Sequence, residues 1–282
     1  MSRKSNIIIW ILFIFSFVCM SYPFISNYLS SKAAKTEAIA FSAKMKNKSD
    51  ENFEKMIIDA QKYNEGLLDG KISMSYPFKS RNKDAAYAVE YNALLNNDND
   101  GVMCFIKIPK MKVNIPVFHG TDDIVLERGA GHLCGTALPV GGKGTHAVIT
   151  AHTGLVKNKL FTDLVNIEKK DKFFINLGRE TLAYEVDSIK IIEPNQLGKY
   201  INVDFDNDYV TLMTCTPYGV NSHRLLVRGH RIPYESESLE ENMTDQNADS
   251  LWFRMYKRLL IMAFTVMGIV FLGMQYMLHK KE

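Results

Sequence analysis

Long apolar runs without charge lie at both ends of the chain. Residues 5–31 contain no charged side chain, and residues 259–278 form a second uncharged stretch. Each run is long enough for the ~20 residues that a helix needs to cross a bilayer. The pattern predicts an N-terminal transmembrane anchor at residues 1–31 and, at residues 256–282, a C-terminal transmembrane helix with a short basic tail.

The orientation in the membrane follows from the flanking charges. Arg3 and Lys4 precede the first run, which predicts a cytoplasmic N-terminus and an extracytoplasmic central domain at the cell membrane. A cleavable signal peptide is the alternative, but the run lacks an A-x-A cleavage signature, which favours a retained anchor. Arg254, Lys257 and Arg258 lie on the outer side of the second run against this orientation. The first span usually dominates, so the prediction stands.

Residues 32–101 form a region that we predict to be helical. Its first part is rich in Ala, Lys, Glu and Met, with apolar residues at spacings of three and four that give a helix one dry face: Met56, Ile57, Ala60 and Tyr63. Ser49 followed by Asp50 is typical of a helix start. A second helix is predicted at residues 85–95, after a polar loop at about residues 71–83.

From Val102 onward the pattern changes to short β-like runs separated by Gly and Pro. We predict strands at residues 103–108, 113–118, 146–151, 172–176, 182–192, 209–215 and 225–232, with one short helix at residues 161–165. So many short strands at residues 102–233 predict a mainly β domain, either a closed barrel or a sandwich. An acidic linker at residues 234–255 joins this domain to the second apolar run.

Composition narrows the function classes. The net charge of +3 is too small to indicate a nucleic-acid-binding protein. The chain has no C-x-x-C or H-E-x-x-H spacing for a metal. Of the four cysteines, Cys19 lies in the first apolar run, which leaves an odd number outside it. Cys104 and Cys134 are interpreted as two small buried thiols, with a disulfide between them as the alternative.

The remaining cysteine, Cys215, has a reactive setting. It ends one predicted strand, and a turn-rich loop leads to Arg224 at the start of the next predicted strand. If the two strands form a hairpin, Cys215 and Arg224 face each other at the mouth of the loop. A neighbouring guanidinium lowers the pKa of a thiol and favours the nucleophilic thiolate, so the pair indicates a cysteine nucleophile.

A cysteine nucleophile normally works with a base, and the chain has seven histidines. His152 follows the apolar run 147–151 just as Cys215 ends its own run. If the two strands are neighbours that end at one edge, their side chains meet. This placement favours His152 as the base, and His223, in the loop beside Cys215, is the alternative.

Four segments together resemble the class C sortases, the pilin-polymerising transpeptidases of Gram-positive cell surfaces. They are GVMCFIKIPKMKVNIPVFHGT, GAGHLCGTALPVGGKGTHAVITAHTGL, LFTDL and TLMTCTPYGVNSHRLLVRGHR, in this order along the chain. The resemblance implies a sortase-type closed β-barrel of about eight strands, with N-terminal helices and a lid loop. It also implies that His152, Cys215 and Arg224 are the catalytic residues.

The same resemblance implies a reaction. Cys215 would cleave a Leu-Pro-X-Thr-Gly-like sorting signal between Thr and Gly through a thioacyl intermediate. The acyl group would pass to a lysine of another pilin subunit, without a cofactor. A sortase that anchors surface proteins to the cell wall peptide and a hydrolytic cysteine peptidase are the alternatives.

The resemblance also gives a meaning to the loop at residues 71–83. Class C enzymes resemble one another in a lid over the cleft, often built on Asp-Pro-aromatic, whose Asp pairs with the catalytic Arg. This chain has Tyr76, Pro77 and Phe78 at that place. The carboxylate is absent, so the prediction is a lid held mainly by the packing of Phe78.

Overall fold

The computed structural model describes residues 3–69, 90–96, 101–154, 158–234, 257–266, 268–270 and 273. The predicted lid residues Tyr76, Pro77 and Phe78 lie outside the described residues, as does nearly all of the predicted acidic linker. Residues 90–93 are helical, whereas the first half of the helix predicted at residues 85–95 also lies outside.

Two helices precede the barrel. Helix α1 (Arg3–Asn47) runs without interruption past the predicted boundary at residue 31, and α2 (Asp50–Leu68) follows it. The second half of α1 presents a buried face to the barrel, made by residues at helical spacings: Ala34, Ala38, Phe41 and Met45. Ser49 caps α2, because its hydroxyl accepts a hydrogen bond from the backbone N–H of Asn52 at 3.3 Å. The helix start predicted at Ser49 is therefore confirmed.

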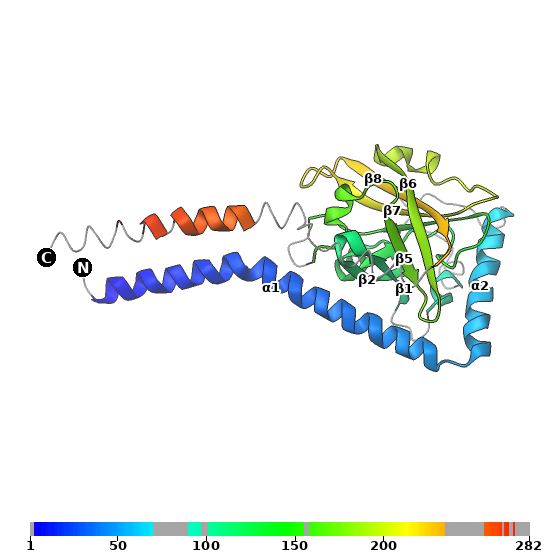
Figure 1. Cartoon of the computed structure of the whole chain (residues 1–282), viewed down its shortest axis with the longest axis horizontal. Helices are drawn as coiled ribbons and strands as arrows, with labels where there is room; N and C mark the ends of the chain where they lie inside the picture. The colour runs from blue at the N-terminus through cyan, green and yellow to red at the C-terminus, as the bar shows by residue number, and fades with distance from the viewer. Residues whose placement is uncertain are drawn as a thin grey trace.

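Eight strands close into a barrel in the order β1-β2-β3-β4-β7-β8-β6-β5 (Figure 1). Their bounds are β1 Val102–Ile108, β2 Val113–His119, β3 Ala130–His132, β4 Thr145–Thr150, β5 Lys172–Asn176, β6 Thr181–Ile192, β7 Asp208–Thr216 and β8 His223–Ile232. The closed barrel predicted from the resemblance is confirmed, and the sandwich alternative is wrong.

Short helical segments lie between the strands: η1 Pro109–Met111, α4 Asp123–Arg128, η2 Thr162–Asn166 and η3 Pro194–Lys199. The helix predicted at residues 161–165 corresponds to η2. The pattern did not predict β3, because three residues, two of them Ala and Gly, are too few to show an alternation of apolar and polar positions.

The alternation of side chains divides the barrel into an inside and an outside. Val210 and Leu212 of β7 and Leu225 and Val227 of β8 belong to the main core inside the barrel. Met213, from the other face of β7, packs in a separate outer cluster with residues of its neighbours and of η3: Leu133, Val148, Ile192, Leu197, Ile201 and Leu226. This outer cluster forms an apolar floor on the outer face of β4, β7 and β8.

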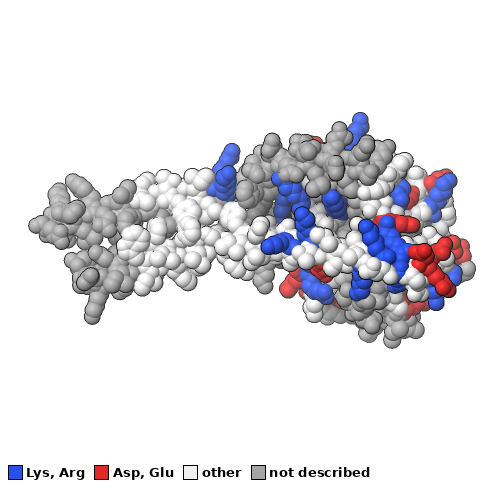
Figure 2. All heavy atoms as spheres, turned by 60° about the horizontal axis from the view of Figure 1, so that its bottom comes forward, with Lys and Arg blue, Asp and Glu red and all other residues white. Residues whose placement is uncertain are grey.

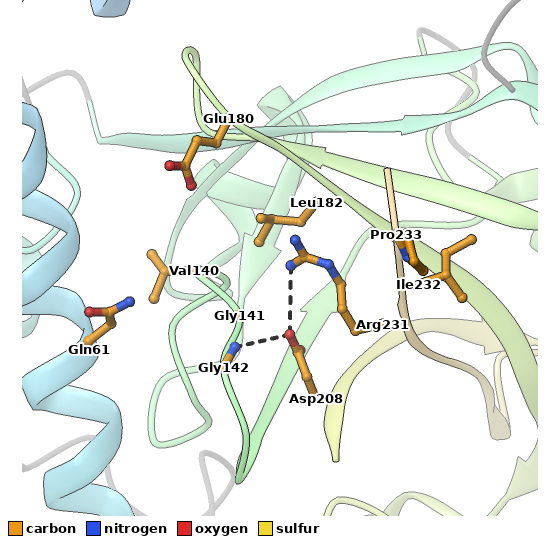
Figure 3. A pocket seen from close by; sticks show the side chains of 10 residues that line it. All are labelled: Gln61, Val140, Gly141, Gly142, Glu180, Leu182, Asp208, Arg231, Ile232 and Pro233. Atoms are coloured by element: carbon orange, nitrogen blue, oxygen red, sulfur yellow. Dashed lines mark hydrogen bonds and ion pairs between the residues drawn. The ribbon is translucent and has the colours of Figure 1, made fainter. Parts of the chain in front are cut away.

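One end of the barrel is held together by Asp208, the first residue of β7. Its carboxylate accepts hydrogen bonds from the Gly142 N–H at 3.0 Å and the Tyr184 hydroxyl at 3.0 Å. Arg231 lies 3.7 Å away, at the centre of a pocket of about 520 Å³ that reaches Gln61 of α2 (Figure 3). Burial raises the pKa of the Asp208 carboxyl although these donors oppose the shift.

The described residues contain one helix that is long and apolar enough to cross a membrane, within residues 10–47 of α1. Residues 257–266 and 268–270 are also helical, and Phe264 contacts Phe17 of α1 at 5.3 Å between ring centroids. Figure 1 shows this segment beside the N-terminal half of α1. The predicted pair of transmembrane helices is thus not confirmed, since only α1 meets the criterion of length and apolarity.

His132 of β3 is completely buried and fully bonded. Its Nε2 lies 2.8 Å from the Ala137 carbonyl oxygen, and its Nδ1 lies 2.8 Å from the Tyr91 hydroxyl. These partners suit a neutral ring that donates from Nε2 and accepts at Nδ1. Burial, the largest cause, lowers the pKa of His132 from its ordinary value of 6.5 to about 4.

This shift makes the stability of the barrel dependent on pH. As the pH falls through about 6.5 the unfolded histidine takes up a proton before the folded one does, so the free energy of unfolding drops until about pH 4. A shift of this size corresponds to about 3 kcal/mol in full. Urea titrations of the wild type and of His132→Gln in detergent should show a stability difference that shrinks as the pH is lowered. A difference that stays constant with pH would contradict the prediction.

Candidate active site

Cys215 and Arg224 lie opposite each other across the β7–β8 hairpin. The antiparallel register pairs Cys215 with Arg224, one step before the pair formed by Thr216 and His223. The hairpin pairing predicted from the sequence is therefore present. Because side chains alternate between the two faces of a strand, Cys215 shares the outer face with Met213, and Arg224 shares it with Leu226. Both residues thus lie at the edge of the outer apolar floor.

His152 reaches the same edge from the neighbouring strand. Strands β4 and β7 are parallel, and their register ends at the pair Thr150 and Met213. The backbone N–H of Ala151 extends this ladder by donating to the Met213 carbonyl at 3.2 Å. His152 therefore stands two residues beyond Thr150 as Cys215 stands two beyond Met213, which is the juxtaposition that the strand-end argument predicted.

Two threonine hydroxyls fasten these strand ends together. The Thr214 hydroxyl donates to the Ala151 carbonyl at 2.8 Å, and the Thr150 hydroxyl donates to the Met213 carbonyl at 3.0 Å. Both threonines are buried. The two bonds cross between the strands directly before His152 and Cys215, so they fix the backbone from which both side chains extend.

Burial separates the competing histidines. His119, His132 and His146 hydrogen-bond to backbone carbonyls, and burial is the main cause that lowers the pKa of each imidazole. His132 and His146 are buried, whereas His119 is partly exposed, as are His152, Cys215 and Arg224. Both ring nitrogens of His119 lie against backbone carbonyl oxygens, those of Gly101 and Leu94. A group that exchanges protons with a substrate must be reachable and have a nitrogen to spare, which favours His152 over these three histidines.

His223 is partly exposed too, but it is placed differently. Its register partner is Thr216, a buried residue on the face of the sheet opposite to that of Cys215. Its Nδ1 lies 2.8 Å from the hydroxyl of Ser222. The alternation of the hairpin therefore points His223 away from the thiol, and His152 is the better candidate for the base.

The Arg224 guanidinium is oriented by its own loop. Its Nη1 donates to the carbonyl oxygens of Asn221 at 3.2 Å and His223 at 3.1 Å. Among the residues that the structure describes, no carboxylate forms an ion pair with Arg224. The remaining N–H groups of the planar fork suit a carbonyl or an oxyanion beside Cys215.

None of the four cysteines is in a disulfide, so the Cys104–Cys134 bridge is not formed. Cys104 is buried, and burial raises the pKa of its thiol far above the ordinary value. Cys134 is only partly buried. Within the described ranges, no three His, Cys, Asp or Glu side chains gather as a metal site would require.

Comparison with known proteins identifies the family. The Sortase domain family matches residues 106–232, which span nearly all of the barrel. Sortase C1 from Streptococcus agalactiae is 35% identical in a comparison that covers 71% of this chain and 100% of that chain, with a TM-score of 0.63. Sortase A of Bacillus anthracis is 26% identical over 227 residues, 80% of this chain and 94% of that protein.

A further solved relative bears on the ligand. Sortase C from Clostridium perfringens, solved with the C-terminal cell wall sorting motif, is 36% identical and has a TM-score of 0.59, covering 71% of this chain and 100% of that chain. The chain therefore belongs to the sortase family of cysteine transpeptidases, and its solved relatives place it among the class C sortases.

The hydroxyl bonds of Thr150 and Thr214 are the part of the site that the sequence did not predict. Thr214 stands directly before Cys215 in the quoted run TLMTC, so its position was visible, but its bond to Ala151 depends on the pairing of two distant strands. Thr211, in the same strand, is equally buried, with 1% of its surface exposed as for Thr214. Its hydroxyl instead lies 2.7 Å from Nε2 of His146.

Thr214 and Thr211 form a matched pair for a test. Thr214→Val keeps the volume but removes the hydroxyl that holds the Ala151 carbonyl, so His152 and Cys215 lose their fixed spacing. We expect turnover to fall on the order of tenfold to a hundredfold, with a loss of about 1 kcal/mol of stability. Thr211→Val should lose similar stability and keep its turnover. The measurements are kcat and KM of transpeptidation with unfolding in urea; an equal loss of turnover in both variants would contradict the prediction.

Proposed function

We propose that this protein is a membrane-anchored sortase that builds pili. It cleaves a Leu-Pro-X-Thr-Gly-like sorting signal between Thr and Gly and joins the new carboxyl terminus to a lysine amine of another pilin subunit. The observation that supports the proposal is the strand pairing that brings the ends of β4 and β7 and the start of β8 to one edge of the barrel, directly beside His152, Cys215 and Arg224. The solved Clostridium perfringens relative with its sorting motif supports the class of substrate.

The reaction has two halves. The Cys215 thiolate attacks the carbonyl carbon of Thr, and the Thr–Gly C–N bond breaks as His152 gives a proton to the leaving amine. A thioacyl enzyme remains. The lysine amine then attacks the thioester carbonyl and gives its proton to His152, and the C–S bond breaks to release the isopeptide and restore the Cys215 thiolate beside a protonated His152. In both halves Arg224 holds the oxyanion with its N–H groups.

The nucleophile can be tested with the other cysteines as controls. Cys215→Ala should abolish cleavage of a Leu-Pro-X-Thr-Gly peptide, because it removes the thiolate that attacks the Thr carbonyl. Cys134→Ala, which removes another partly buried thiol, should cleave at the wild-type rate. Peptide cleavage followed by chromatography, with mass spectrometry of the trapped thioacyl enzyme, measures both. Activity retained by Cys215→Ala would refute the mechanism.

The acceptor distinguishes pilin polymerisation from the two alternatives. Mixing the full chain in detergent with a pilin that carries both the sorting signal and candidate lysines should give ladders of high-mass, isopeptide-linked products. A product joined only to a cell wall peptide amine would indicate wall anchoring. Cleaved monomer alone would indicate hydrolysis. Replacing the acceptor lysines of the pilin with arginine is the control, since it keeps their charge and should remove the ladders.

Membrane anchoring is the other part of the proposal. Residues 10–31 of α1 lack charged side chains, and Figure 2 shows the described part of this end of the molecule as an almost uncharged surface beside the charged barrel domain. Large apolar side chains are exposed along it, as a bilayer would accept: Trp10, Leu12, Phe15, Val18, Ile25 and Leu29. We propose that α1 spans the membrane and that residues 256–282 span it beside α1. The lid at Tyr76, Pro77 and Phe78 stays a prediction.

A further inference from the structure

The barrel end that carries the active site is tied to the membrane helix. Phe161 is bonded to His152, because the Phe161 N–H donates to the His152 carbonyl at 3.2 Å. Two residues before Phe161, the chain meets α1, because the Lys159 N–H donates to the side-chain oxygen of Asn27 at 3.0 Å. Asn27 is a polar residue inside the uncharged run 5–31.

The position of Asn27 along α1 determines where this contact lies relative to the bilayer. At 1.5 Å per residue, the stretch from residue 5 to residue 27 is about 33 Å long, close to the ~30 Å of a bilayer's hydrocarbon layer. Tyr28, the next residue, is 67% exposed, and tyrosine is enriched where a span meets the headgroups. Asn27 and Lys159 therefore lie at the level of the bilayer surface when α1 spans it.

The β7–β8 loop lies at the same end and is apolar at its tip. Tyr218 and Val220 are 59% and 70% exposed, and residues 216–222 carry no charge. The loop is held against the loop of His152, because the Tyr218 ring packs over Gly154, where a Cβ would come within 3.1 Å of it. Gly154 has a positive φ of +83°, which adds to the need for glycine.

Figure 1 shows this arrangement as a whole: the active-site end of the barrel, with the β7–β8 loop in yellow, is turned toward the apolar half of α1. The other end, where β7 begins at Asp208 and α2 passes, is turned away. That far end also exposes an aromatic side chain, Phe205, which is 73% exposed. The length of β7, nine residues, separates the two ends by about 26 Å.

We propose that the β7–β8 loop rests in the headgroup region of the phospholipid bilayer that α1 spans, with Tyr218 and Val220 as its contacts. Single exposed apolar residues are ordinary on protein surfaces. Here two occur on an uncharged loop at the level where α1 leaves the hydrocarbon, beside the exposed Tyr28. This inference rests on the proposed anchoring by α1, and it places the Cys215 edge against the membrane surface, where a membrane-held substrate would present its sorting signal.

The test uses tryptophan as a reporter of lipid contact. The chain has two tryptophans, Trp10 and Trp252. The full chain with Trp10→Phe and Trp252→Phe therefore has no tryptophan emission of its own, and a tryptophan introduced into it is the single reporter. Tyr218→Trp reports on the loop, and Phe205→Trp is the matched control at the far end. Each chain is reconstituted in vesicles of phosphatidylcholine and phosphatidylglycerol, with and without brominated acyl chains, and co-flotation and peptide cleavage are measured in parallel.

The expected result is that Tyr218→Trp emits at shorter wavelength in vesicles and loses most of its emission to the brominated lipid, whereas Phe205→Trp changes in neither respect. Chains that co-float and cleave peptide with no quenching at position 218, or with equal quenching at both positions, would overturn the inference alone. A third outcome is that brominated lipid does not quench the tryptophan at position 218 but a soluble sorting peptide shifts its emission. That outcome would overturn the inference and indicate that the loop contacts the substrate. Failure to co-float would instead count against the anchoring, and loss of cleavage against the proposed enzyme.

Discussion

The parallel pairing of β4 with β7 is the contact on which the active site depends. It brings together two strand ends that are 63 residues apart in the chain, and the Thr150 and Thr214 hydroxyls hold those ends where the ordinary backbone ladder stops. The hairpin of β7 with β8 then adds Arg224 to the same edge. The proposed nucleophile, base and oxyanion donor thus stand at the ends of three adjacent strands of one closed sheet, which is more rigid than a set of loops would be.

The two ends of the barrel use their polar residues differently. At the far end, Asp208 accepts several hydrogen bonds and lies close to Arg231, so its buried carboxylate is satisfied and structural. At the active-site end, His152, Cys215 and Arg224 are only partly buried, and their functional groups can reach a ligand. Buried histidines such as His132 belong to the structural kind, since each is hydrogen-bonded inside the fold and resists protonation.

Helix α1 links the catalytic domain to the proposed membrane anchor without a flexible joint. Its apolar half carries exposed hydrophobic residues, while its second half packs Ala38, Phe41 and Met45 against the barrel. One continuous helix with contacts to the barrel along its second half and at Asn27 restricts how the barrel can turn relative to the bilayer. The proposed orientation of the Cys215 edge toward the bilayer surface would then follow from packing, and an enzyme acting on membrane-held substrates would benefit from it.

Local patterns along the sequence determined most of the strands and one side of the candidate site. The alternation of residues within β7 and β8 and the turn between them were enough to predict that Cys215 faces Arg224, because a hairpin joins near neighbours in the chain. The cap at Ser49 and most strand bounds were visible for the same reason. Tertiary structure alone decided that β4 lies beside β7, which histidines are buried, and that Lys159 binds Asn27. These contacts join residues far apart in the chain, and they form only when the barrel closes and α1 packs against it.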